Sequence, residues 1–185
     1  MKYRAGWVAN SSSNSFVVGF LRSRIPTTIE EVKSLLFPKG FWGGVWDGDG
    51  SVSLDRAAEA ILGDIQEQGG REAKGLSIRE VFEGVVSGHF PGTPKMPGDD
   101  APDPFKDRDG WDAAWNEYTR KKRLAARRCA KTFRDGAAAL YKAEAPGEEV
   151  VFLKFCYSDE DGHFYSALEH GDTFAALPHV AVSHH

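Results

Sequence analysis

The sequence predicts an α+β domain in which a small antiparallel or mixed sheet, built from strands near both ends, carries three to four packed helices. Short runs rich in β-branched and aromatic residues occur at 15–22, 149–157 and 180–184. Between them, apolar residues recur at the spacing of helices. The length of 185 residues, with 41% hydrophobic residues, suits one domain with a substantial core. We therefore treat 1–185 as a single domain.

The first expected elements are two strands, at residues 2–9 and 15–22, on either side of a polar turn at 10–14. A helix should follow, because Thr27 or Thr28 is a good N-cap and two glutamates occupy the next turn.

Two further helices are expected before the middle of the chain. Ser53 opens one that runs to about Gln68, and Ser77 caps another. Residues 89–110 then form an irregular loop rich in proline and aspartate, which contains five of the nine prolines.

The second half begins with one long predicted helix, from Trp111 to about Lys142, with a possible interruption at Gly136. A strand at 149–157 should then pair with a second strand at 164–168 in a hairpin. After these, residues 172–177 suit one helical turn, and a short last strand is expected at 180–184.

The long helix carries its positive charge on one side. Residues 120–134 hold eight basic side chains and no acid, which leaves 15 basic against 27 acidic residues elsewhere. On a helical wheel most of the basic residues form one stripe, opposite an apolar face. That apolar face comprises Trp111, Trp115, Tyr118, Ala125, Cys129, Phe133 and Leu140. The candidate anion-binding residues are Arg120, Arg123, Arg127, Arg128, Lys131 and Arg134.

Like charges one helical turn apart repel, so this pattern favours an anion that compensates them. One possibility is internal: the acidic loop from Asp99 to Asp109 folds back over the helix. The other is an external partner, either nucleic acid or an acidic protein surface. An ordinary solvated helix face is the alternative to both.

Histidines and carboxylates are concentrated near the end of the chain, where five of the six histidines occur. Imidazole and carboxylate suit Zn²⁺, Mn²⁺ or Fe²⁺, and the tetrad from Glu169 to Asp172 includes a glycine that permits a sharp turn. The candidate metal ligands are His170, Asp172 and His179. No established zinc-ligand spacing is present, so hydrogen-bonding surface histidines are the ordinary interpretation.

Smaller features are compatible with more than one role. The turn with Ser11, Ser12 and Ser13 suits a phosphate as well as a plain turn. Cys129 and Cys156 are expected to be buried free thiols, although a disulfide between them stays open. No signal peptide or membrane-length apolar stretch is apparent, so we expect a cytoplasmic protein, of a host cell or associated with a virion.

Two terminal segments carry a resemblance. The stretch from Gly6 through Asn10-Ser11-Ser12-Ser13-Asn14-Ser15 to Phe16, and the ending from Leu168-Glu169-His170-Gly171-Asp172 to His185, resemble the ends of small bacterial and phage proteins. No activity is attached to that group, so the resemblance implies no mechanism. It implies that the serine turn and the histidine tail lie together, on adjacent strands, and it favours a phage or prophage accessory protein.

Three functions follow as hypotheses. The first is a non-catalytic binding or regulatory module that presents its basic helix to an anionic partner. The second is a small divalent-metal-dependent hydrolase, a nuclease or phosphoesterase, that uses the C-terminal histidines and aspartates. The third is a structural or assembly protein. Composition decides neither whether the protein is an enzyme nor its oligomeric state.

Overall fold

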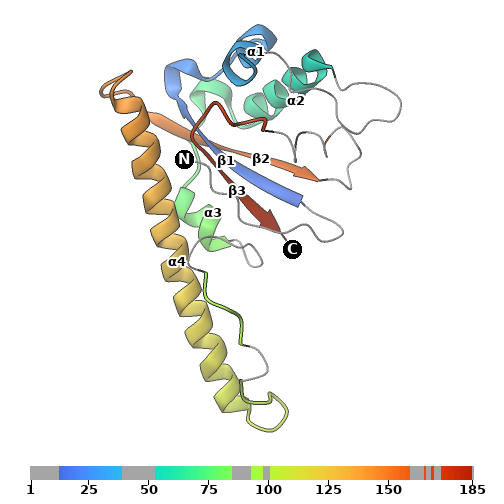
Figure 1. Cartoon of the computed structure of the whole chain (residues 1–185), viewed down its shortest axis with the longest axis vertical. Coiled ribbons are helices and arrows are strands. Elements are labelled where there is room, and N and C mark those ends of the chain that lie inside the picture. Colours follow the sequence, from blue (N-terminus) through green and yellow to red (C-terminus); the bar gives the residue numbers. More distant parts are fainter. Residues whose placement is uncertain are drawn as a thin grey trace.

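The computed structural model of the chain describes residues 13–38, 53–84, 93–97, 101–158, 165, 168 and 172–184. Three strands and four α-helices lie within these residues, and the predicted α+β class is confirmed (Figure 1). They are β1 (Ser13–Leu21), α1 (Ile29–Leu36), α2 (Leu54–Glu67), α3 (Ile78–Gly84), α4 (Arg108–Lys142), β2 (Val150–Ser158) and β3 (His179–His184), with the short 3₁₀ turns η1 (Arg22–Arg24) and η2 (Gly70–Glu72).

The three strands form one antiparallel sheet in the order β2-β1-β3. The central strand β1 comes early in the chain, and both of its neighbours come from the end. The sequence predicted strands near both ends of the chain, but not this order. In this register Phe16 lies opposite Phe155 on one side and Ala181 on the other. Successive side chains of a strand point to opposite faces, so β1 supplies apolar residues to both faces.

Helices cover both faces of the sheet. Helices α1 and α2 pack on the face that carries Phe16, Val18 and Phe20, and form the larger core with them. Helices α3 and α4 pack on the opposite face, against Val17 and Phe152. Figure 1 shows α4 running past the sheet, on the side away from α1 and α2. The result is a three-layer arrangement that holds α4 firmly by one half of its length.

Short polar motifs start the helices where the sequence predicted. Thr28 is the N-cap of α1, because its side chain accepts a hydrogen bond from the Glu31 backbone nitrogen at 3.2 Å. Glu31 in turn accepts one from the backbone nitrogen of Thr27 at 2.6 Å, which lowers the pKa of this carboxyl. Ser53 caps α2 in the same manner, by accepting from the Arg56 nitrogen at 3.2 Å.

The outer edge of β2 is occupied by the segment that follows α2. The side-chain amide of Gln68 donates to the Lys154 carbonyl at 2.8 Å and accepts from the Lys154 nitrogen at 2.9 Å. Further along, the backbone nitrogen of Leu76 donates to the Phe152 carbonyl at 2.9 Å. These contacts satisfy backbone groups that an edge strand would otherwise expose.

The predicted hairpin after β2 is wrong. Tyr165 and Leu168 are helical, and Leu168 is fully buried in the larger core. A hairpin strand would need the outer edge of β2, which Gln68 and Leu76 already occupy.

The limits of two other predicted segments differ from those in the structure. The irregular loop ends before its predicted limit of residue 110, because α4 begins at Arg108. Two successive turns, with Ala175 bonded to Asp172 and Leu177 to Phe174, occur where one helical turn was expected. The strand expected at residues 2–9 lies outside the described residues.

Candidate anion-binding surface

Helix α4 is a single uninterrupted helix of 35 residues, about 52 Å long. Asp107 is its N-cap and accepts a hydrogen bond from the Gly110 nitrogen at 2.9 Å. The interruption considered at Gly136 is absent, and the helix continues through it to Lys142. The cationic residues of α4 therefore project from one rigid rod.

Small side chains bring α4 close to its neighbours. Ala125, Ala126, Ala130 and Ala137 are its buried residues, and they pack with α3 and the sheet in the second core. The ring of Phe133 contacts that of Phe152, with centroids 5.5 Å apart. The apolar face predicted for this half of the helix is thus confirmed at Ala125, Cys129 and Phe133.

Leu140 departs from that prediction, because it is 56% exposed. At this end of α4 the sheet-facing position belongs to Tyr141, whose hydroxyl donates to the Gly19 carbonyl at 2.9 Å. Near the other end, α4 extends well beyond the sheet (Figure 1). There Trp111 stacks on Trp115, and Trp115 contacts Tyr118, so the aromatic residues pack partly on one another.

All six candidate anion-binding residues are exposed, and we call them the basic surface. They are Arg120, Arg123, Arg127, Arg128, Lys131 and Arg134. Lys122 is different, since it is half-buried and its burial lowers the pKa of its amine. A helical wheel places Lys122 toward the apolar side of the helix, which accounts for this burial. The basic surface spans about 21 Å along the helix axis, from Arg120 to Arg134.

Two acids of α4 partly neutralise the ends of the basic surface. Glu117 bonds Arg120 at 2.7 Å and lies 3.5 Å from the Lys121 amine, which lowers its carboxyl pKa to about 2. The hydrogen bond from Arg120 is the main cause. At the other end Asp135 bonds Lys131 at 2.6 Å and Arg134 at 3.3 Å, and its pKa is also lowered.

The middle of the basic surface is different. Arg123 and Arg128 are exposed, and neither forms an ion pair with any described residue. The pairing at the ends was not predicted, because Glu117 and Asp135 lie just outside the run of basic residues at 120–134. Within that run the cations follow one another without an acid.

The preceding loop does not cover this surface with the acids that the structure describes. Asp103 accepts from the backbone of Phe105 at 2.9 Å and pairs with Lys106 at 3.3 Å, while Asp107 caps the helix. Asp99 and Asp100 lie outside the described residues. For the described acids of this loop, the interpretation of internal neutralisation is therefore wrong.

A recess of about 280 Å³ lies between α3 and α4, beside the basic surface. Arg79 of α3 and three cations of α4, Arg127, Lys131 and Arg134, are among its lining residues, and no acid is among those that the structure describes. The remaining lining residues are Leu76, Ser77, Ile78, Ala130 and Phe152. We call this the α3–α4 recess. Sequence analysis missed Arg79, because an isolated arginine in a short helix carries no local sign of its neighbours on α4.

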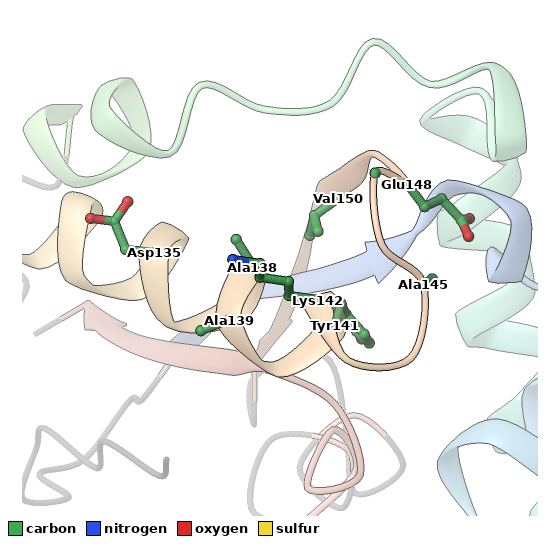
Figure 2. A pocket seen from close by; sticks show the side chains of 9 residues that line it. Asp135, Ala138, Ala139, Tyr141, Lys142, Ala145, Glu148 and Val150 are labelled. Carbon is green, nitrogen blue, oxygen red and sulfur yellow. The ribbon is translucent and has the colours of Figure 1, made fainter.

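A second cavity, of about 530 Å³, lies where the last turns of α4 meet the connection to β2. Figure 2 shows Asp135 and Glu148 at opposite ends of it, with Tyr141 and Lys142 between them. Burial raises the pKa of Tyr141 to about 12. Because the charged residues around this cavity have mixed signs, it offers no selective attraction to an anion.

The metal-binding prediction is tested only in part. His170 lies outside the described residues, Asp172 is exposed, and the ring of His179 contacts the Leu177 carbonyl at 2.9 Å. Among the residues that the structure describes, no group of three histidine, cysteine or acidic side chains converges to hold a metal. The three-residue metal site stays a prediction.

Of the serine turn, Ser13 is described: it is the first residue of β1 and pairs with His184 of β3. Ser11 and Ser12 lie outside the described residues, and the phosphate role of this turn stays a prediction.

Both cysteines are free thiols. Cys129 is half-buried, and burial raises the pKa of its thiol. Cys156 is exposed rather than buried, because the alternate positions Phe155 and Tyr157 face the larger core. The Cys156 sulfur lies 3.2 Å from the hydroxyl of the buried Ser15.

No helix within the described ranges is both long and apolar enough to cross a bilayer. Comparison with known proteins adds no family: the chain matches no protein-family model, no curated protein and no solved structure.

Proposed function

We propose that this protein binds nucleic acid through the basic surface of α4, as a non-catalytic binding or regulatory module. The observation that supports it is the row of exposed cations along about 21 Å of one helix, with the acids Glu117 and Asp135 paired to cations near its two ends. Arg123 and Arg128 mark the part of this row that has no acidic partner among the described residues.

The chemistry of the surface favours nucleic acid over an acidic protein. Protein–protein interfaces have an apolar centre and are depleted in charged residues there, whereas protein–DNA interfaces are strongly positive. Between Arg120 and Arg134 the one exposed large apolar side chain is Leu124, at 39%. Phosphates follow one another about every 3.4 Å along each strand of a duplex, so the basic surface, about 21 Å long, passes about six of them. Such contacts supply affinity without reading sequence.

The segregation of charge supports the same proposal. Helix α4 carries ten basic and four acidic residues, while the whole chain has a net charge of −4. The remainder of the protein therefore repels a polyanion, and α4 is the element that attracts one. A nucleic acid should approach along this helix rather than over the α1 and α2 layer.

The first experiment measures the affinity of the full chain for a labelled oligonucleotide by fluorescence anisotropy, at several salt concentrations. If about five phosphates are contacted, log affinity should fall with log salt with a slope of roughly −3.5 for a single strand and −4.5 for a duplex. An affinity that does not change with salt would contradict the proposal.

Charge reversal provides the matched test. Arg123→Glu should weaken binding about three- to tenfold, because it removes one phosphate contact and adds a repulsive charge. Arg56→Glu makes the same change of charge on the exposed first turn of α2, on the other side of the sheet, and should change the affinity less than about twofold. Circular dichroism confirms that both variants fold. If the variants bind alike, or if only an acidic protein binds, the proposal fails.

A further inference from the structure

We propose that α4 binds DNA in its duplex form, by lying in the major groove with cations directed toward both phosphate backbones. This inference rests on the proposed function, and adds to it the form of nucleic acid and the groove that the helix enters. It predicts a preference among nucleic acids of equal charge, which attraction to phosphate alone does not produce.

Leu124 marks the side of α4 that faces away from the rest of the fold. Ala126 is buried and packs with α3 and the sheet in the second core. Successive residues of a helix are about 100° apart around its axis, so Leu124 lies about 160° from Ala126. The side chain of Leu124 is exposed. A duplex that meets α4 from outside therefore meets Leu124 at the centre of the contact.

Cations flank Leu124 on both sides. Arg120 and Arg123 lie about 40° and 100° from it around the helix axis in one direction. Lys121 and Arg128 lie about 60° and 40° from it in the other direction. All four side chains are exposed. One row of cations would suit a single backbone, whereas cations on either side of an apolar side chain suit the two backbones that border a groove.

The dimensions of a helix and of the major groove agree. An α-helix with its side chains is about 10–12 Å across, and the major groove of B-form DNA is about 12 Å wide and 8.5 Å deep. The minor groove, about 6 Å wide, does not admit a helix. Since α4 packs on α3 and the sheet by its opposite side, these elements do not obstruct the entry of its outer side.

Acids limit the length of α4 that can follow the groove. Glu117 and Asp135 stand about 27 Å apart along the axis. The groove winds around the duplex once in about 34 Å, whereas α4 is one continuous rod. A rod stays within the groove for less than one turn, which matches the stretch that carries cations without an acid. The acids of the first turns, Asp109 and Asp112, then fall outside the contact.

The floor of the major groove offers a chemical partner to Leu124. Among the bases of DNA, thymine presents a methyl group there, and apolar side chains contact it. Leu124 is the one exposed large apolar side chain between Arg120 and Arg134. We therefore expect the protein to distinguish thymine from uracil in a duplex, although its phosphate contacts read no sequence.

The first test compares a DNA duplex, an RNA duplex and a DNA single strand of one sequence and length, by anisotropy with the full chain. The DNA duplex should bind at least roughly tenfold more tightly than the RNA duplex, because the major groove of A-form RNA is too narrow for side chains to enter. It should also bind more tightly than the single strand, which has one backbone and no groove. An RNA duplex that binds as tightly as the DNA duplex would overturn the inference.

The second test replaces every thymine of the DNA duplex by uracil, which removes a methyl group from the major groove and leaves the phosphates unchanged. The affinity should fall about two- to fourfold, as expected for the loss of one buried methyl contact. Leu124→Ala should abolish this difference. Equal affinities of the wild type for the two duplexes would show that Leu124 does not reach the groove floor, and the inference would be wrong.

Leu140→Ala is the matched control, since Leu140 is an exposed leucine of the same helix outside the basic surface. It should preserve both the affinity and the difference between thymine and uracil. Circular dichroism confirms that both variants fold. Loss of the difference in both variants would also contradict the contact proposed for Leu124.

A third comparison identifies the groove. Netropsin, which occupies the minor groove, should not displace the protein, whereas glucosylated 5-hydroxymethylcytosine, which places a sugar in the major groove, should weaken binding roughly tenfold. The reverse result would place the protein in the minor groove and overturn the inference.

The two proposals can fail separately. If the duplexes and the single strand bind alike and Arg123→Glu still weakens each of them, the basic surface binds phosphate without entering a groove. The inference is then wrong and the proposed function stands. If no nucleic acid binds, both are wrong.

Discussion

The hydroxyl of Tyr157 donates a 2.9 Å hydrogen bond to the carboxylate of Asp64 and so joins β2 to α2. Burial raises the pKa of both groups: Asp64 is pushed above its ordinary 3.8, and Tyr157 well above 10. The hydrogen bond acts in the opposite direction on Asp64, because it stabilises the ionised carboxylate. The hydrogen bond therefore ties Tyr157, whose ring is part of the larger core, to a carboxylate of α2.

Tyr157→Phe should destabilise the fold by about 1–2 kcal/mol, because a half-buried carboxylate loses its donor. It should also raise the Asp64 pKa further. A raised acid pKa favours folding at low pH, and this contribution is lost as pH rises from about 3.8 through the folded-state value. Because the pKa of Asp64 is higher in the variant, the contribution of Asp64 to stability should continue to decline up to a higher pH than in the wild type. Urea unfolding and NMR titration measure both effects, and Tyr118→Phe, with no hydroxyl contact to any described residue, serves as the control.

Gln68→Met should cost about 1 kcal/mol, since both hydrogen bonds to the Lys154 backbone disappear while water reaches the freed groups. It should also increase self-association, because the edge of β2 loses its cover at this point. Urea unfolding and light scattering test these results. Gln66→Met, at an exposed position in the last turn of α2, should change neither; similar behaviour of the two variants would refute the role given to Gln68.

Ala126→Leu should destabilise the protein by roughly 1–3 kcal/mol, because Ala126 is 1% exposed and a larger side chain separates α3 from α4. Ala139→Leu introduces the same side chain at an exposed position of α4 and should change the free energy of unfolding by less than about 0.5 kcal/mol. Thermal unfolding compares them. Equal stabilities would show that α3 does not pack tightly on α4.

The pKa of Tyr141 gives a prediction at alkaline pH. Because it rises from 10 to about 12, the phenol favours the folded state below pH 10, and this contribution is lost as pH increases through about 12. Absorbance titration of wild type should contain a late-ionising tyrosine that is missing in Tyr141→Phe. The variant should also be less stable at neutral pH, by about 1 kcal/mol, since the bond to the Gly19 carbonyl is lost.

Glu117→Gln should strengthen nucleic-acid binding by about two- to fivefold, because Glu117 competes with phosphate for Arg120 and Lys121. The pairing lowers the Glu117 pKa to about 2, so the competing charge persists at every pH used for binding. Asp112→Asn removes a similar charge that lies 4.0 Å from Arg108, outside the basic surface, and should have less effect. Weaker binding by Glu117→Gln would argue that Glu117 organises the surface instead of competing for it.

Local chemistry accounts for what the sequence predicted well. Thr28 and Ser53 cap their helices through hydrogen bonds that span only three residues, so their roles are visible in a short stretch of sequence. The helical period likewise placed Ala125 and Phe133 on the packed face of α4 and Lys122 beside them. These features follow from spacing along one element.

The predictions failed where the structure depends on contacts between elements that are far apart in the sequence. A hairpin after β2 is a reasonable local expectation, but the edge it needs is held by Gln68, which is 86 residues distant from Lys154. Arg79 joins the candidate site only through the packing of α3 on α4. The pairing of Glu117 with Arg120 is local, at a spacing of three residues, but was not predicted because Glu117 precedes the run of basic residues that begins at Arg120.

The order of strands has a consequence for synthesis. β1 is the middle strand, yet β2 and β3 are both translated after α4 is complete. Until then the nascent chain presents Val17, Val18 and Phe20 without partners for their backbone, and closing so long a loop is slow. We expect this segment to need chaperone protection on the ribosome, and premature termination before Val150 to yield an aggregating fragment.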